Sequence, residues 1–119
     1  MQDPDSFAGR VRELALSFPE AYEDSPWGHP VFKVAENKMF ASMSVEGDAL
    51  NVTVKLTAEE REIAYLLPYV SRAHYVGRFG WVTARVADEE SLENALEWLR
   101  ESYWLKAPTH LKAAVEGDG

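Results

Sequence analysis

Side chains that could perform catalytic or metal chemistry are few and widely spaced in this sequence. The three histidines, His29, His74 and His110, show no i, i+4 pairing, and the chain has no cysteine, so a metal site would need histidine or carboxylate ligands from distant segments. No G-x-S-x-G, Walker or G-x-G-x-x-G motif occurs. Glu23 and Asp24 are candidates for an acid pair at a pocket, but adjacent carboxylates in a polar loop are usually solvated. We therefore predict a non-enzymatic protein without a metal or cofactor.

The distribution of charge restricts the partners of the chain. A formal charge of −8 repels nucleic acid and anionic membranes through its net field. Residues 27–86 nevertheless contain seven basic and six acidic side chains, so the negative charge belongs to the two ends of the sequence. No run of 18 apolar residues occurs, and the first residues, MQDPDSFAG, do not resemble a signal peptide. We predict a cytoplasmic protein with one domain over residues 1–119, ordered at about 3–107, and no membrane partner.

Alternating apolar and polar side chains predict three consecutive antiparallel strands between Val31 and Lys55. The alternation is clearest over residues 50–56. Gly47-Asp48 and Glu36-Asn37 supply residues that favour tight turns on either side of the middle strand. Residues 69–75 are expected to be extended, and residues 81–86 repeat the alternation and predict a further strand.

Three helices are expected around this sheet, because capping residues and prolines bound segments with helical apolar spacing. They are predicted over residues 4–18, 58–67 and 89–107. The middle helix has Ile63, Leu66 and Leu67 as its apolar positions, and residues 20–30 are predicted as a short extended piece followed by a loop. The fold class is α+β, an antiparallel sheet flanked by helices, in the order helix, three strands, helix, two strands, helix.

The polar positions of the predicted strands define one face of the sheet without any acidic residue. Basic, aromatic, hydroxyl and amide groups on an open sheet can contact phosphates and stack on bases, and Lys38 and Arg78 lie near strand tips that extend this surface. A solvated face, or one covered by a helix or a second subunit, is the alternative. The predicted face consists of Val31, Lys33, Phe40, Ser42, Ser44, Asn51, Thr53, Lys55, Trp81, Thr83 and Arg85.

Five short motifs run along most of the chain: Ser25-Pro26-Trp27-Gly28, Val31-Phe32-Lys33-Val34, Lys38-Met39-Phe40-Ala41, Trp81-Val82-Thr83 and LRESYWL at residues 99–105. Through their order and spacing, these motifs together resemble the MmcQ/YjbR family. The resemblance implies an α+β fold similar to secretion chaperones and DNA binding through a double-wing motif. The wings would be the turn at residues 36–38 and the tip at residues 77–80, which contribute Lys38 and Arg78.

The sequence thus predicts a binding module with one of two partners. The first is DNA, bound weakly through the acid-free face and the strand tips. The second is another protein or a second copy of the chain, bound through the same face. The residues predicted to contact nucleic acid are Lys33, Lys38, Lys55, Arg78, Arg85, Phe40 and Trp81.

Overall fold

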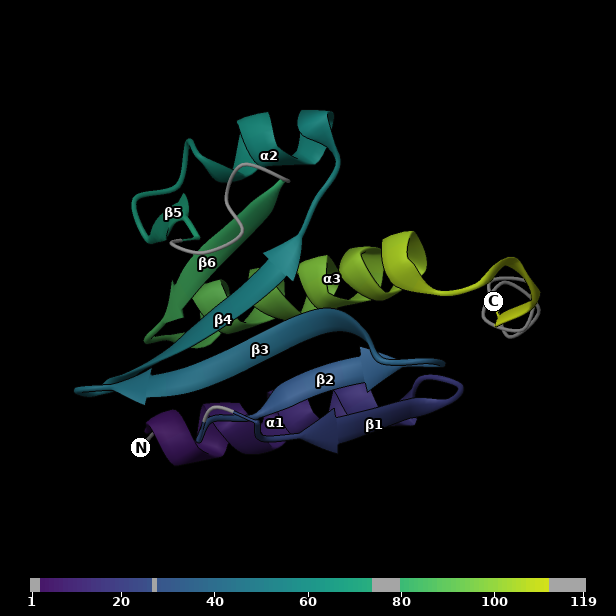
Figure 1. Ribbon diagram of the computed structural model, residues 1–119. Coiled ribbons are helices and arrows are strands. Elements are labelled where there is room, and N and C mark those ends of the chain that lie inside the picture. The colour runs from purple at the N-terminus through teal and green to yellow at the C-terminus, as the bar shows by residue number, and fades with distance from the viewer. Residues whose placement is uncertain (1–2, 27, 74–79, 112–119) are drawn as a thin grey trace.

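The computed structural model describes residues 3–26, 28–73 and 80–111, which form an antiparallel sheet and flanking helices (Figure 1). The sheet has six strands in the order β1-β2-β3-β4-β6-β5, so the predicted α+β class is confirmed. Within these residues no helix combines the length and apolar character needed to cross a bilayer. The elements are α1 (Pro4–Ser17), β1 (Ala21–Asp24), β2 (Val31–Val34), β3 (Lys38–Glu46), β4 (Ala49–Lys55), α2 (Ala58–Ala64), β5 (Val70–Arg72), β6 (Trp81–Val86) and α3 (Glu89–Lys106).

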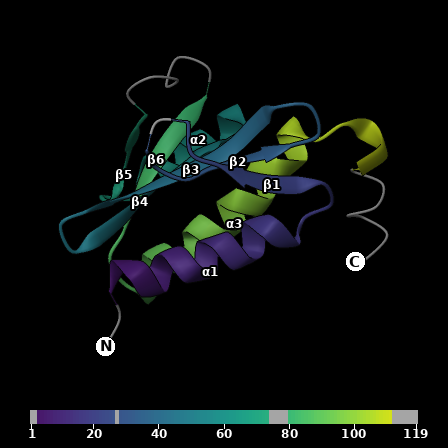
Figure 2. The same ribbon diagram turned by 60° about the horizontal axis from the view of Figure 1, so that its bottom comes forward.

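Helices α1 and α3 lie side by side on one face of the sheet, as Figure 2 shows. The core between them and the strands includes Phe7 and Val11 of α1, Leu99 of α3, and Val52 and Val54 of β4, each at most 1% exposed. We call the opposite side of the sheet the outer face. Its central row is formed by residues that lie opposite one another on β3, β4 and β6, namely Ser42, Thr53 and Thr83.

Capping side chains begin the helices where the sequence predicts. The Asp3 carboxylate accepts a hydrogen bond from the Ser6 amide at 2.8 Å, and Asp88 and Ser91 form a reciprocal capping box at α3. The turn between β3 and β4 is at Gly47-Asp48, as expected, and Gly47 has a φ of 62° that an L side chain rarely adopts. These local signals fix the start of each long helix and the register of the central hairpin.

Strand β1 extends the sheet beyond the predicted meander. The sequence predicts only a short extended piece here, because residues 21–24 show no apolar alternation. In the structure they pair antiparallel with β2 and form one edge of the sheet. Their side chains are largely exposed, so backbone hydrogen bonds rather than burial hold this strand in place.

A β-bulge in β3 turns Phe40 toward the helices. Phe32 lies opposite Ala41 but Lys33 lies opposite Met39, which leaves Phe40 as the extra residue. Phe40 is fully buried, with its ring centroid 5.3 Å from that of Tyr103 and 6.0 Å from that of Phe18. The prediction that Phe40 lies on the outer face is therefore wrong, since strict alternation does not continue through a bulge.

Helix α2 is shorter than predicted and leaves most of its apolar side chains in solvent. It ends at Ala64, which is fully buried, and Leu67 packs only partly against the core. Ile63 is 60% exposed and Leu66 82% exposed. The expected apolar positions of this segment therefore do not form a buried stripe.

Candidate functional site

Lys33 on the outer face already forms hydrogen bonds with neighbouring side chains. The residue is only 9% exposed, and its Nζ donates to Asp24 Oδ2 at 3.0 Å and to Asn37 Oδ1 at 2.5 Å. The hydrogen bond from Lys33 lowers the pKa of the Asp24 carboxyl below its usual value. Because β1 carries Asp24 onto the same side of the sheet as Lys33, the prediction of an acid-free face is wrong.

Arg85 at the other end of the outer face also lies beside carboxylates. Its guanidinium is 3.5 Å from Glu46 Oε1 and 3.4 Å from Asp48 Oδ1, both at the β3–β4 turn. Such exposed pairs add little stability. They nevertheless place two negative charges next to the one cation, which weakens its attraction for a phosphate.

The aromatic residues of the predicted surface are not available for stacking on bases. Phe40 belongs to the core, and Trp81 on β6 is only 5% exposed. Arg78 of the predicted second wing lies outside the described residues. The outer face therefore presents mainly hydroxyl and amide groups rather than the predicted basic and aromatic surface.

Three other lysines gather at one end of the sheet, and we call them the lysine cluster: Lys38, Lys55 and Lys106. They stand at the start of β3, the end of β4 and the last turn of α3. Figure 1 shows these three ends on the same side of the molecule. Of the three, Lys38 and Lys55 were predicted as binding residues from the sequence, and Lys106 was not.

The buried hydroxyl of Ser102 ties the elements of the lysine cluster together. Ser102 Oγ accepts a hydrogen bond from the Lys55 amide at 2.9 Å and donates one to the Phe40 carbonyl oxygen at 2.5 Å. It thereby bridges β3 and β4 just beyond their last paired residues, Ala41 and Val54. Lys106 follows Ser102 by four residues and so lies on the same side of α3.

The charges of the lysine cluster act on one another. Burial lowers the pKa of the Lys106 ammonium, and the positive charges of Lys55 and Lys38 lower it further. Among the described residues, none of the three has an ion pair. The arrangement can therefore accept an anion, which would relieve the repulsion between the ammonium groups.

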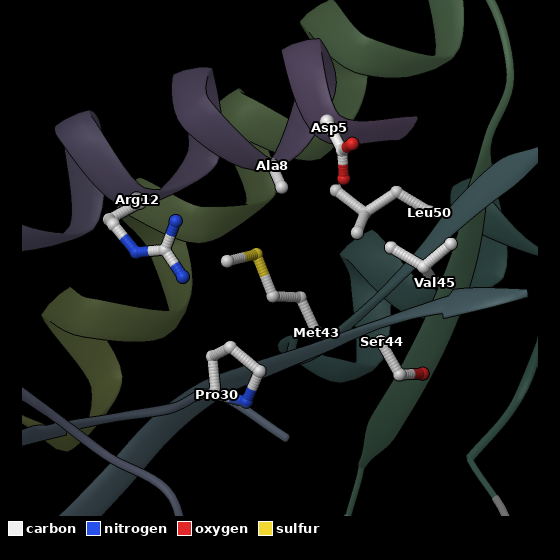
Figure 3. Close-up of a pocket in the computed structure, with 8 residues that line it drawn as sticks. All are labelled: Asp5, Ala8, Arg12, Pro30, Met43, Ser44, Val45 and Leu50. Atoms are coloured by element: carbon white, nitrogen blue, oxygen red, sulfur yellow. The ribbon is translucent and has the colours of Figure 1, made fainter. Parts of the chain in front are cut away.

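A shallow pocket of about 380 Å³ lies between α1 and the β3–β4 hairpin (Figure 3). Asp5 and Arg12 reach its lining from α1, with Met43 between them. The Arg12 guanidinium donates to both carboxylate oxygens of Glu23, at 2.8 and 3.3 Å, and the hydrogen bond to Glu23 raises the pKa of Arg12. The charge of Arg12 is thus already balanced by a carboxylate from β1.

Glu23 and Asp24, the acid pair considered from the sequence, have different partners on different sides of the sheet. Glu23 points to α1 and bonds Arg12, whereas the neighbouring Asp24 bonds Lys33 on the outer face. His110 lies 3.7 Å from Glu20, and His74 is outside the described residues. Within the described parts of the chain, no three histidine, aspartate or glutamate side chains are grouped to hold a metal ion.

The sequence contains a signal for Lys106 that alternation within strands does not capture. Tyr103 belongs to the predicted apolar stripe of the last helix, and Ser102 and Lys106 flank that stripe at helical spacing. A polar residue beside a buried stripe indicates contact with the sheet, and a lysine one turn later lies at the same border. This spacing could have placed Lys106 near the strand ends.

Comparison with known proteins finds a matching family and solved structures with a similar fold. The YjbR family model matches residues 16–105. A crystal structure of a Deinococcus radiodurans protein with domain DUF419 is similar, with a TM-score of 0.71 and 25% identity over 82% of this chain and 76% of that one. A Pseudomonas syringae protein shares the fold, with a TM-score of 0.64 and 15% identity over 83% of this chain and 97% of that one. No curated protein shows significant similarity to the sequence.

Proposed function

The chain belongs to the YjbR family, and we propose that it is a non-enzymatic binding module whose lysine cluster binds the phosphate backbone of DNA weakly. The observation that carries this proposal is the convergence of Lys38, Lys55 and Lys106 without an ion pair among the described residues. Phosphate contacts from lysine provide affinity without reading sequence. The proposal therefore concerns nonspecific backbone binding.

The surroundings of Lys33 and Arg85 favour the lysine cluster rather than the outer face as the site of phosphate binding. Lys33 and Arg85 each lie within 3.5 Å of a carboxylate oxygen, so a phosphate would have to compete with an internal partner. The cluster lysines have no such competitor among the described residues. Binding at the cluster would also relieve the repulsion between the ammonium groups, which adds to the effect of burial in lowering the pKa of Lys106.

The number of cluster lysines sets the expected salt dependence. Three phosphate contacts predict a slope of log affinity against log salt of about −2.7 on duplex DNA, or about a fortyfold loss between about 50 and 200 mM salt. The net charge of −8 keeps the affinity low at any salt concentration. A module of this kind would work beside other DNA contacts rather than alone.

The decisive experiment is an NMR titration of the ¹⁵N-labelled protein with a short DNA duplex at low and then moderate salt. We expect shifts at the amides of the cluster lysines that fade as salt rises. Lys55→Gln should weaken binding and reduce the salt slope by about 1. Arg85→Gln removes the same charge from the outer face and should leave affinity almost unchanged.

Two results would contradict the proposal. If Arg85→Gln weakened binding as much as Lys55→Gln, the outer face rather than the cluster would be the contact surface. If no amide shifted at low salt, DNA would not be the partner of the cluster.

A further inference from the structure

Three large apolar side chains at the end of α2 stand in solvent, and we call them the α2 patch: Ile63, Tyr65 and Leu66. They are 60%, 43% and 82% exposed. The Leu66 amide donates to the Ile63 carbonyl oxygen at 3.1 Å, so the two residues belong to one closed turn. The patch is thus held by backbone hydrogen bonds in a defined shape.

Folding does not account for the α2 patch. Ala64 is the side chain of α2 that enters the core, and Leu67 packs partly against it. Figure 1 shows α2 beyond the ends of β4 and β6, apart from the layer formed by α1 and α3. A leucine at 82% exposure gains almost nothing from burial in this fold, whereas several large exposed apolar side chains on one turn are typical of contact surfaces.

The border of the patch is acidic. Glu59, Glu60 and Glu62 lie on the same short helix, and none has an ion pair among the described residues. Arg61, the basic residue of the helix, donates from Nη1 to the Leu56 carbonyl oxygen at 2.8 Å, and so turns back toward the end of β4. The patch therefore combines an apolar centre with a negative rim.

We infer that the α2 patch docks a basic amphipathic helical segment of another protein, with apolar side chains over Ile63 and Leu66 and lysine or arginine beside the glutamates. Charge favours this partner over a second copy of the chain. A symmetric contact between two copies would bring the glutamates of both together, and each copy carries a net charge of −8. Ile63 and Leu66 are three residues apart, the spacing at which an amphipathic helix also presents its apolar side chains.

A pair of synthetic peptides tests the inference directly. The probe is a fluorescent helical peptide of leucine and lysine with one apolar face, and its control has the same composition in an order that destroys that face. We expect the probe to bind more tightly than the control, and Leu66→Ser to lower its affinity about tenfold or more. Val45→Ser is the matched control variant, because Val45 is 53% exposed at the far end of β3 and should not affect binding.

Further variants distinguish peptide docking at the α2 patch from charge attraction alone and from self-association. Glu62→Gln should weaken the probe less than Leu66→Ser does, and the effect of Glu62→Gln should vanish at high salt. Lys55→Gln should leave peptide binding intact, so failure of the lysine cluster and failure of the α2 patch are distinguishable. Equal binding of the two peptides, or equal effects of Leu66→Ser and Val45→Ser, would overturn the inference. So would concentration-dependent dimerisation that Leu66→Ser abolishes, since the occupant would then be a second copy.

Discussion

Replacing Ser102 with alanine tests whether one buried hydroxyl holds the cluster end of the sheet together. Ser102 is fully buried and makes two hydrogen bonds, one from the Lys55 amide and one to the Phe40 carbonyl. Ser102→Ala leaves both backbone groups without this partner. Each unsatisfied buried group costs about 1–3 kcal/mol, and two groups are affected. Because the structure can relax in part around them, we expect a total loss of about 2–4 kcal/mol in the free energy of unfolding.

Urea denaturation followed by circular dichroism measures this loss. With a slope of about 2 kcal/mol per molar urea for a domain of this size, the midpoint should fall by about 1–2 M without a change in slope. Ser44→Ala is the control, because Ser44 is half-buried on the outer face and its side chain makes no hydrogen bond to any residue that the structure describes. It should change stability by less than about 0.5 kcal/mol.

Hydrogen exchange at one amide separates a local opening from a general loss of packing. In Ser102→Ala, the Lys55 amide should exchange faster than expected from the global loss of stability, while the Thr53 amide in the same strand should follow that loss. Unchanged relative protection of Lys55, together with a stability change no larger than that of Ser44→Ala, would refute the bridging role of Ser102.

Four further substitutions test other parts of the fold. Ala35→Gly should raise the free energy of unfolding by about 0.5–1 kcal/mol in urea melts, because Ala35 has a φ of 53°. Gly47→Ala should lower the free energy of unfolding through backbone strain alone, because the new methyl group meets nothing within 4 Å. Phe40→Ala should lower the free energy of unfolding by about 3–5 kcal/mol in the same assay, because Phe40 is fully buried. A loss below about 1 kcal/mol would indicate that Phe40 lies at the surface. Burial raises the pKa of Tyr103, so the stabilising contribution of Tyr103 is complete below pH 10 and is lost as pH rises through the higher pKa of the folded state. Above pH 10, urea midpoints should therefore fall more steeply for the wild-type protein than for Tyr103→Phe.

Alternation along a strand predicts burial well where the neighbouring strands keep a regular register. In β4, Leu50, Val52 and Val54 are each about 1% exposed, as the pattern predicts, because β3 and β6 pair with this strand residue by residue. Phe40 shows the limit of the same reasoning. Its orientation depends on a bulge between β2 and β3, and a bulge is a property of two paired strands rather than of one sequence segment.

Helical spacing predicts an apolar stripe but not whether the helix reaches the core. The spacing of Ile63, Leu66 and Leu67 predicts a helix that continues to Pro68. The helix ends at Ala64, however, and only this alanine and Leu67 contact the core. Where a helix lies relative to the sheet is decided by the elements on either side of it, so the exposure of Ile63 could not be predicted from the sequence.

The availability of a cation depends on the tertiary neighbours that surround it. Lys33 and Arg85 fit the predicted binding face by parity, yet a strand edge and a hairpin turn bring carboxylates to both. Lys106 has a structural role of its own, because cations stabilise the last turn of a helix through its dipole. That role does not extend to Lys38 and Lys55, whose charges add to the effect of burial in lowering the pKa of Lys106. In a protein with 20 acidic residues, the proposed binding of an anion would account for three neighbouring lysines without a carboxylate partner among the described residues.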